Sequence, residues 1–219
     1  MKKNDLKIWG AGTVRTLRPI WVAEELGLDY KLYPIGPRTG ETQTDEFTHL
    51  NPKQKIPFLE HGDIKLSESL TICRYLQNAF PSEKLPSPKD FITQAKEDEW
   101  CNYIYGEIDE TALYVMRRHY DLTEIYGNAP KAVEACRKHL KRHFNVINDH
   151  LKKNKTILKD GFCLADIMLI SCLDWAIFYK FKLPKNIMTY RNLIIKRPAY
   201  LKARDINYNS SKGVINGTS

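Results

Sequence analysis

The stretch NPKQKIPFLEHGDIKLSESLTICRYL, residues 51–76, decides how the first third of this chain is expected to fold. Residues 56–59 form an apolar run opened by proline, which suits the start of a β-strand. Gly62 and Asp63 provide turn chemistry between two short apolar segments, so we expect a hairpin. Apolar residues then return at helical spacing from Leu70, which places Glu68 and Ser69 in the first turn of a helix.

The start of that helix is suited to hold an amino acid. Its free backbone N–H groups and the positive end of its dipole favour a carboxylate, and Glu68 can hold an ammonium group. If the bond between Ile56 and Pro57 is cis, the backbone of Ile56 can turn outward and pair with an extended peptide. The plainer interpretation is a hairpin followed by an ordinary capped helix, with serine as the cap.

The residues before this stretch predict the order β-α-β. We expect a helix to begin near Thr16 as its N-cap, because Pro19 then lies in the first turn, and to end at Gly27. The other expected elements are strands at residues 6–9 and 28–35 and a short helix from Asp45 to Leu50. Together with the hairpin and its helix, they predict an α/β thioredoxin-like domain over residues 1–80.

The second part of the chain predicts an all-α helical bundle. Three prolines between Phe80 and Pro88 indicate a linker at 81–89, followed by a helical domain at 90–204 and a mobile polar tail at 205–219. We expect the domain to close with a helix from Asn192 to Arg204. Two apolar stripes at helical spacing support the helical bundle. They are formed by Ile104, Ile108, Ala112 and Val115, and by Val133, Cys136, Leu140, Phe144, Ile147 and Leu151.

Residues 162–178 are apolar almost all round, so they predict the buried central helix of the bundle. Asp166 falls in the first turn of that helix, where it can stabilise the dipole and bond back to the preceding turn. Cys163 occupies the cap position, although a thiol is a poor acceptor.

Composition limits the classes of function. The chain has 219 residues, 42% of them hydrophobic, enough for one or two domains. A run of about 20 apolar residues and a signal-peptide block are both lacking. The five scattered cysteines argue against a disulfide framework, so we expect a cytoplasmic protein without a membrane segment. The net charge is +8, but the basic excess at 131–155 suits the solvated face of a helix, so we expect no nucleic-acid partner.

His139 and His143 are four residues apart on one predicted helix, a spacing found in metal-binding pairs. No Glu-x-x-His motif accompanies the pair on that helix, and the surroundings are basic. We therefore expect an exposed pair and no metal.

Residues 55–69 resemble the glutathione-binding segment of the glutathione S-transferase family, in particular the cytosolic Ser/Thr type of the bacterial, theta or zeta classes. The resemblance covers about Leu6 to Arg204. It implies a homodimeric detoxification enzyme with glutathione as co-substrate, whose thiolate attacks small hydrophobic electrophiles. A glutathione-dependent isomerase, dehalogenase or peroxidase stays open as an alternative, as does a non-catalytic binding or regulatory protein of the same fold.

The resemblance implies roles for particular residues. Glu68 and Ser69 match the family pair that holds the γ-glutamyl amine and carboxylate. Ile56 matches the residue whose backbone pairs with the cysteinyl unit, and Pro57 resembles the family's cis-proline.

The remaining contacts are less closely defined by the resemblance. Gln54 or Lys55 can meet the glycyl carboxylate, with Lys55 the better charge match, and His49 is a further candidate. The hydrophobic co-substrate is expected against the helical domain, with lining chosen from Trp100, Tyr103, Tyr105, Tyr114, Arg117 and Trp175.

Thr13 falls at the position of the family's serine, counted back from the turn after Leu26. A free thiol with a pKa of about 8.5 is mostly protonated at neutral pH, and a hydroxyl donor beside a helix N-terminus lowers that pKa. Thr13 is therefore the predicted thiolate stabiliser, and a turn hydroxyl is the alternative. Arg15 lies near the family's cysteine position, where it can add positive field, bind a substrate anion or remain solvated.

Overall fold

A computed structural model describes residues 5–210 of the chain. It divides into two compact units, one built from residues up to Ser87 together with those from Lys196 on, the other spanning Pro88–Ile195. None of the described helices is long and apolar enough to cross a membrane.

The first unit contains a four-stranded sheet in the order β2-β1-β3-β4. Its strands are β1 (Leu6–Trp9), β2 (Lys31–Tyr33), β3 (Phe58–His61) and β4 (Ile64–Ser67). β1 pairs with β2 in parallel and with β3 in antiparallel register, and β3 and β4 form the expected hairpin. Gly62, at the turn, has φ of 58°, a left-handed conformation that glycine adopts without a steric penalty.

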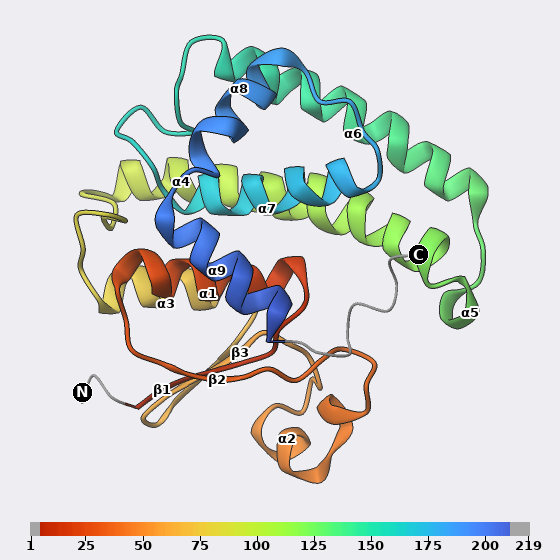
Figure 1. Cartoon of the computed structure of the whole chain (residues 1–219). Coiled ribbons are helices and arrows are strands. Elements are labelled where there is room, and N and C mark those ends of the chain that lie inside the picture. The colour runs from red at the N-terminus through yellow and green to blue at the C-terminus, as the bar shows by residue number, and fades with distance from the viewer. Residues whose placement is uncertain (1–4, 211–219) are drawn as a thin grey trace. The chain divides into compact units, whose positions relative to one another are not determined.

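The helices of this unit cover both faces of the sheet (Figure 1). They are α1 (Val14–Leu26), α2 (Asp45–Leu50), α3 (Ser69–Ala79) and α9 (Pro198–Asn209), with a short 3₁₀ turn, η1 (Glu41–Gln43). α1 and α3 lie on one face and α2 on the other. The thioredoxin-like arrangement predicted from the sequence is confirmed.

The predicted start of the first helix is wrong. Thr13 is the N-cap of α1, and Thr16 is the third residue of the helix, with each hydroxyl bonding to the backbone N–H of the other residue. This reciprocal capping box satisfies two donors at the helix start, so the helix begins one turn earlier than expected. Pro19 consequently lies inside the helix, not in its first turn.

The predicted closing helix and tail are also displaced. α8 (Lys185–Ile194) includes Asn192, and a separate helix, α9, starts at Pro198, because proline suits the first helical position and not the interior. α9 continues to Asn209, so residues 205–209 are helical and not a mobile tail. This helix packs on α1, with Tyr200 edge-on to Trp21 at 4.9 Å between ring centroids, and thus belongs to the first unit. Residues 211–219, also assigned to the tail, lie outside the described residues.

The second unit is helical throughout. Its elements are α4 (Phe91–Tyr103), the π-helices η2 (Ile104–Tyr114) and η3 (Arg117–Asp121), α5 (Thr123–Tyr126), α6 (Pro130–Leu151), α7 (Leu164–Phe178) and α8. All six apolar stripe residues of α6 are buried, as expected, and α7 is the buried helix. Val115 is only half-buried, whereas Leu113 and Met116 are fully buried, because the wider turn of η2 displaces the apolar stripe.

Asp166 bonds back to the turn before α7, as predicted. Its carboxylate accepts from the backbone N–H groups of Ile157 and Cys163 at 2.9 Å and from the Tyr190 hydroxyl at 2.7 Å. Complete burial raises the pKa of Asp166, and these donors oppose that shift.

Candidate active site

The N-terminus of α1 carries a network of hydroxyl groups around Thr13. Thr13 Oγ1 accepts the N–H of Thr16 at 3.0 Å and lies 3.0 Å from Thr16 Oγ1. The single Thr16 hydroxyl proton has two acceptors of its own, Asn207 Oδ1 at 2.7 Å and the Thr13 carbonyl at 2.9 Å. The proton between the two hydroxyls is therefore supplied by Thr13, and that proton can be redirected to a bound acceptor.

The turn between β1 and α1 brings Ile56 close to this network. Gly10 has φ of +105°, and a Cβ added there would lie 2.6 Å from Ile56 Cβ and 2.9 Å from Thr16 Cγ2. Only glycine fits at position 10, because any side chain there would collide with Ile56 and Thr16. The Ile56–Pro57 bond is cis, and among residues 5–210 no protein group hydrogen-bonds to the Ile56 backbone N–H or C=O.

The start of α3 departs from an ordinary capped helix. Glu68 is the N-cap residue, with φ of 72° and ψ of 119°, and its side chain does not cap the helix. Its carboxylate instead lies 3.2 Å from the ammonium of Lys53 and is 56% exposed. A positive φ is rare for a residue with a side chain, and such strained residues concentrate at functional sites.

A buried arginine supports the neighbouring serine. Arg18 on α1 is fully buried and donates to Ser69 Oγ at 3.2 Å, so a guanidinium lies beside the positive end of the α3 dipole. Burial raises the pKa of the nearby Cys73 thiol to about 12, although the charges of Arg18 and Arg74 oppose that shift. Cys73 is therefore a neutral thiol at physiological pH and not a nucleophile.

The three residues predicted as candidates to bind the glycyl carboxylate differ in exposure and in their hydrogen bonds. The Gln54 amide donates to Thr48 at 3.0 Å and its backbone has φ of 52°, while Lys55 is exposed with its carbonyl bound to Asn51. His49 lies in the last turn of α2. Arg15, the second residue of α1, is half-buried.

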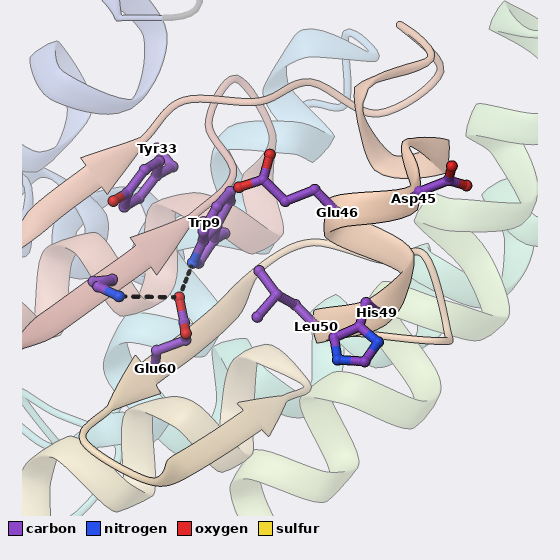
Figure 2. Close-up of a pocket in the computed structure, with 8 residues that line it drawn as sticks. Trp9, Tyr33, Asp45, Glu46, His49, Leu50 and Glu60 are labelled. Carbon is purple, nitrogen blue, oxygen red and sulfur yellow. Dashed lines mark hydrogen bonds and ion pairs between the residues drawn. The ribbon is translucent and has the colours of Figure 1, made fainter.

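A separate pocket of about 590 Å³ lies between the sheet and α2. Figure 2 shows Glu46 extending toward Trp9, while Asp45 extends away. Trp9 stacks on Tyr33 at 4.0 Å and donates to Glu60 at 2.8 Å. Of the residues predicted to bind or act on a ligand, only His49 lines this pocket, and the other lining residues are Lys7, Trp9, Tyr33, Asp45, Glu46, Leu50 and Glu60.

Several residues predicted to line the hydrophobic site contact other side chains of the second unit. Arg117 pairs with Asp121 at 2.8 Å, and Asp121 also accepts the Tyr179 hydroxyl at 2.5 Å. Trp175 stacks on Tyr179 at 6.3 Å. Tyr105 and Tyr114 are half-buried, the latter with the Arg118 guanidinium 4.5 Å from its ring centroid. Trp100 and Tyr103 instead pack on His150 and His143 of α6.

The expectation of an exposed histidine pair is wrong. The side chains of His139 and His143 are 20% and 12% exposed, and Glu107 of η2 lies beside both. Burial is the largest cause that lowers the pKa of His143, and the charges of His139 and Arg142 lower it further, while Glu107 opposes them. The companion carboxylate was missed because it comes from another helix and not from α6.

Sequence reasoning also missed three residues of the site itself. Lys53 neutralises Glu68, Arg18 supports Ser69, and Asn207 fixes the Thr13 network. Arg18 had a detectable signal, because it lies among Leu17, Ile20 and Trp21 on the apolar face of α1. Asn207 had none, because its partners are 191 residues or more away along the chain.

Comparisons with known proteins match both units. Residues 4–78 match the family model "Glutathione S-transferase, N-terminal domain", and residues 107–198 match "Glutathione S-transferase, C-terminal domain". Glutathione S-transferase 3 of Zea mays is 30% identical over 168 residues, 74% of this chain and 73% of that protein. Glutathione S-transferase GstA of Escherichia coli O157:H7 is 27% identical over 179 residues, 80% and 85% of the two chains.

A solved structure supports the fold. A delta-class glutathione transferase of Nilaparvata lugens aligns with a TM-score of 0.81 at 21% identity, over 94% of this chain and 96% of that one.

Proposed function

The chain belongs to the glutathione S-transferase family, and from that premise we propose that it is a glutathione transferase. It binds glutathione, whose thiol releases its proton to solvent, and catalyses attack of the resulting thiolate on an electrophilic carbon of a small hydrophobic compound. The new S–C bond forms as a leaving group departs from that carbon, or by addition to an activated double bond. Holding both reactants in line supplies a large part of the rate enhancement, and stabilising the thiolate supplies the rest.

The observation that carries this proposal is the backbone of Glu68. Its positive φ points the carboxylate away from its own helix, and the ion pair with Lys53 keeps that carboxylate at the surface. Glu68 thus holds the γ-glutamyl ammonium. The N–H groups at the start of α3, the Ser69 hydroxyl and the buried charge of Arg18 receive the γ-glutamyl carboxylate.

The rest of glutathione extends from this clamp toward α1. Its cysteinyl unit pairs with the backbone of Ile56 ahead of Pro57, in the manner of an added strand. Lys55 receives the glycyl carboxylate, with Gln54 as the neighbouring amide donor. Lys55 suits this role because it is exposed and positively charged.

The Thr13 hydroxyl donates a hydrogen bond to the glutathione sulfur. Its Oγ1 already accepts the Thr16 N–H, which makes the hydroxyl a stronger donor. The start of α1 adds positive potential, and Arg15 strengthens it. Each of these effects favours the thiolate over the thiol.

The electrophile contacts the second unit through Tyr105, Tyr114, Arg117 and Trp175. The protein acts as a homodimer in the cytoplasm, as family members do. A reducing compartment agrees with its five cysteines, which are all buried thiols outside any disulfide.

The test is calorimetric titration of glutathione, and of S-methylglutathione, into the wild type and a Glu68→Ala/Ser69→Ala variant. Both ligands should bind the wild type, because the clamp does not involve sulfur, and neither should bind the variant. Glu46→Ala, in the separate pocket, is the matched control and should bind normally. A wild type that fails to bind millimolar glutathione contradicts the proposal.

A Glu68→Gly variant makes this test more specific, because glycine adopts a positive φ without steric strain. This variant should be at least as stable as the wild type and still lose glutathione. Loss of binding then cannot be attributed to unfolding.

A further inference from the structure

Three side chains outside the proposed glutathione site converge in the second unit. Glu107 comes from η2, and His139 and His143 lie one turn apart on α6. Among residues 5–210 they form the one group of three His, Cys, Asp or Glu residues whose ligand atoms lie close enough to share an ion.

The distances match coordination of one metal. His139 Nε2 and His143 Nε2 lie 3.0 and 3.6 Å from Glu107 Oε2. Each of the three residues offers one ligand atom that lies within 4.8 Å of those of the other two. Metal–ligand bonds of about 2.0–2.2 Å in a tetrahedron separate neighbouring ligands by roughly 3.3–3.5 Å. Small rotations of the side chains reach this geometry without a change in the backbone.

The second shell orients one of the ligands. His143 Nδ1 lies 2.7 Å from the Tyr103 hydroxyl. If Nδ1 donates its proton to that oxygen, Nε2 keeps its lone pair and faces Glu107. Metal-binding histidines regularly have such a partner on the second ring nitrogen.

The helix that carries Glu107 is unusual in itself. η2 is a π-helix of 11 residues, and such helices are rare and concentrate at functional sites. His139 Nε2 donates to the Glu107 carbonyl at 3.1 Å, so a metal ion that binds this nitrogen displaces its proton into solvent.

Arg142 currently provides the positive charge at this cluster. Its Nη2 lies 3.4 Å from His139 Nδ1 and 3.3 Å from His143 Nε2. Arg142 is exposed, so its long side chain can move into solvent when a cation arrives.

We propose that Glu107, His139 and His143 bind a divalent transition metal of the zinc class, with a water molecule in the fourth position. Two imidazoles and one carboxylate are a ligand set that suits zinc, and the open position makes the site exchangeable. Glu107 is 44% exposed, which provides access for the ion. This proposal departs from the sequence-based expectation of a protein without a metal.

The test uses zinc titrated by calorimetry and cobalt followed by visible absorption, which reports tetrahedral coordination. The wild type should bind one ion per chain, and Glu107→Gln and His143→Ala should each abolish binding. Tyr103→Phe should weaken it roughly 10- to 100-fold, the usual effect of removing a second-shell partner. Arg142→Ala should tighten it, because the competing cation is gone.

His119→Ala is the matched control, because that histidine contacts the Gly127 carbonyl and lies outside the cluster. It should bind zinc as the wild type does. A wild type without binding at micromolar zinc, or with binding unchanged by Glu107→Gln and His143→Ala, overturns the proposal. Glutathione binding by these variants should be unaffected, so this result is independent of the proposed transferase site.

Discussion

Substitutions at Thr13 separate two roles of one hydroxyl group. As an acceptor, Oγ1 caps α1 by receiving the Thr16 N–H, and as a donor it is proposed to bind the glutathione sulfur. Thr13→Asp keeps a capping oxygen but cannot donate a proton, whereas Thr13→Ser keeps both abilities and Thr13→Ala loses both. The three variants therefore distinguish a stabiliser of the thiolate from a simple helix cap.

The expected magnitudes follow from the hydrogen bonds. A hydrogen bond to a charged group contributes about 1.5–3 kcal/mol, which corresponds to a thiol pKa roughly 1–2 units higher when that bond is lost. At neutral pH kcat/KM should fall about 10- to 150-fold in Thr13→Ala. The fall in Thr13→Asp should be at least as large, because its carboxylate also repels the thiolate. Thr13→Ala also loses the cap, about 1 kcal/mol, and should melt about 2–4 °C lower.

The assay combines the ultraviolet absorbance of bound thiolate with the pH dependence of kcat/KM for a chromogenic electrophile. We expect a lowered pKa of the bound thiol in the wild type, so the rate should rise at a lower pH than for free glutathione. The midpoint should move upward in Thr13→Asp and stay in place in Thr13→Ser. A wild-type pH profile in a stable Thr13→Asp variant would refute the reasoning.

Three further changes test individual interactions in the two units. Asn207→Ala should lower the unfolding free energy by about 1–3 kcal/mol in denaturant titrations, because it removes the buried partner of two hydrogen bonds; a loss below that range would contradict the assigned network. Arg197→Ala should cost about 3–5 kcal/mol in the same measurement, since Arg197 bonds both oxygens of Glu25, which is only 3% exposed. The pKa of Asp90, the N-cap of α4, is lowered from 3.8, first by the backbone N–H of Thr93. A carboxyl group whose pKa is lower in the folded state stabilises the protein at pH values above its unfolded pKa. The melting-temperature difference between wild type and Asp90→Ala should therefore be present at neutral pH and disappear as the pH falls below 3.8. A difference that persists in acid would argue against this cap.

Local signals in the sequence predict most of the elements. The turn chemistry at Gly62 and Asp63 predicts the hairpin, and the apolar stripe of α6 predicts each of its buried residues. These succeed because a turn, or one face of a helix, depends on residues a few positions apart.

Errors arise where distant residues compete with a local signal. Pro19 favours a late start for α1, but the Thr13–Thr16 capping box outweighs it. The polar segment after residue 204 looks like a tail, but its Asn207 is fully buried against α1. The positions of Arg18 and of Glu107 beside His143 depend on packing between helices, which periodicity along one segment does not contain.

The placement of α9 has a consequence for protein synthesis. A ribosome completes the entire second unit before it adds α9, yet α9 packs on α1, near the start of the chain. Until then the Thr16 hydroxyl and the Thr13 carbonyl lack the Asn207 side chain. A nascent chain can therefore form its sheet and hairpin while the hydroxyl network around Thr13 is still incomplete. That network, beside the proposed position of the sulfur, reaches its final geometry only when translation has passed residue 207.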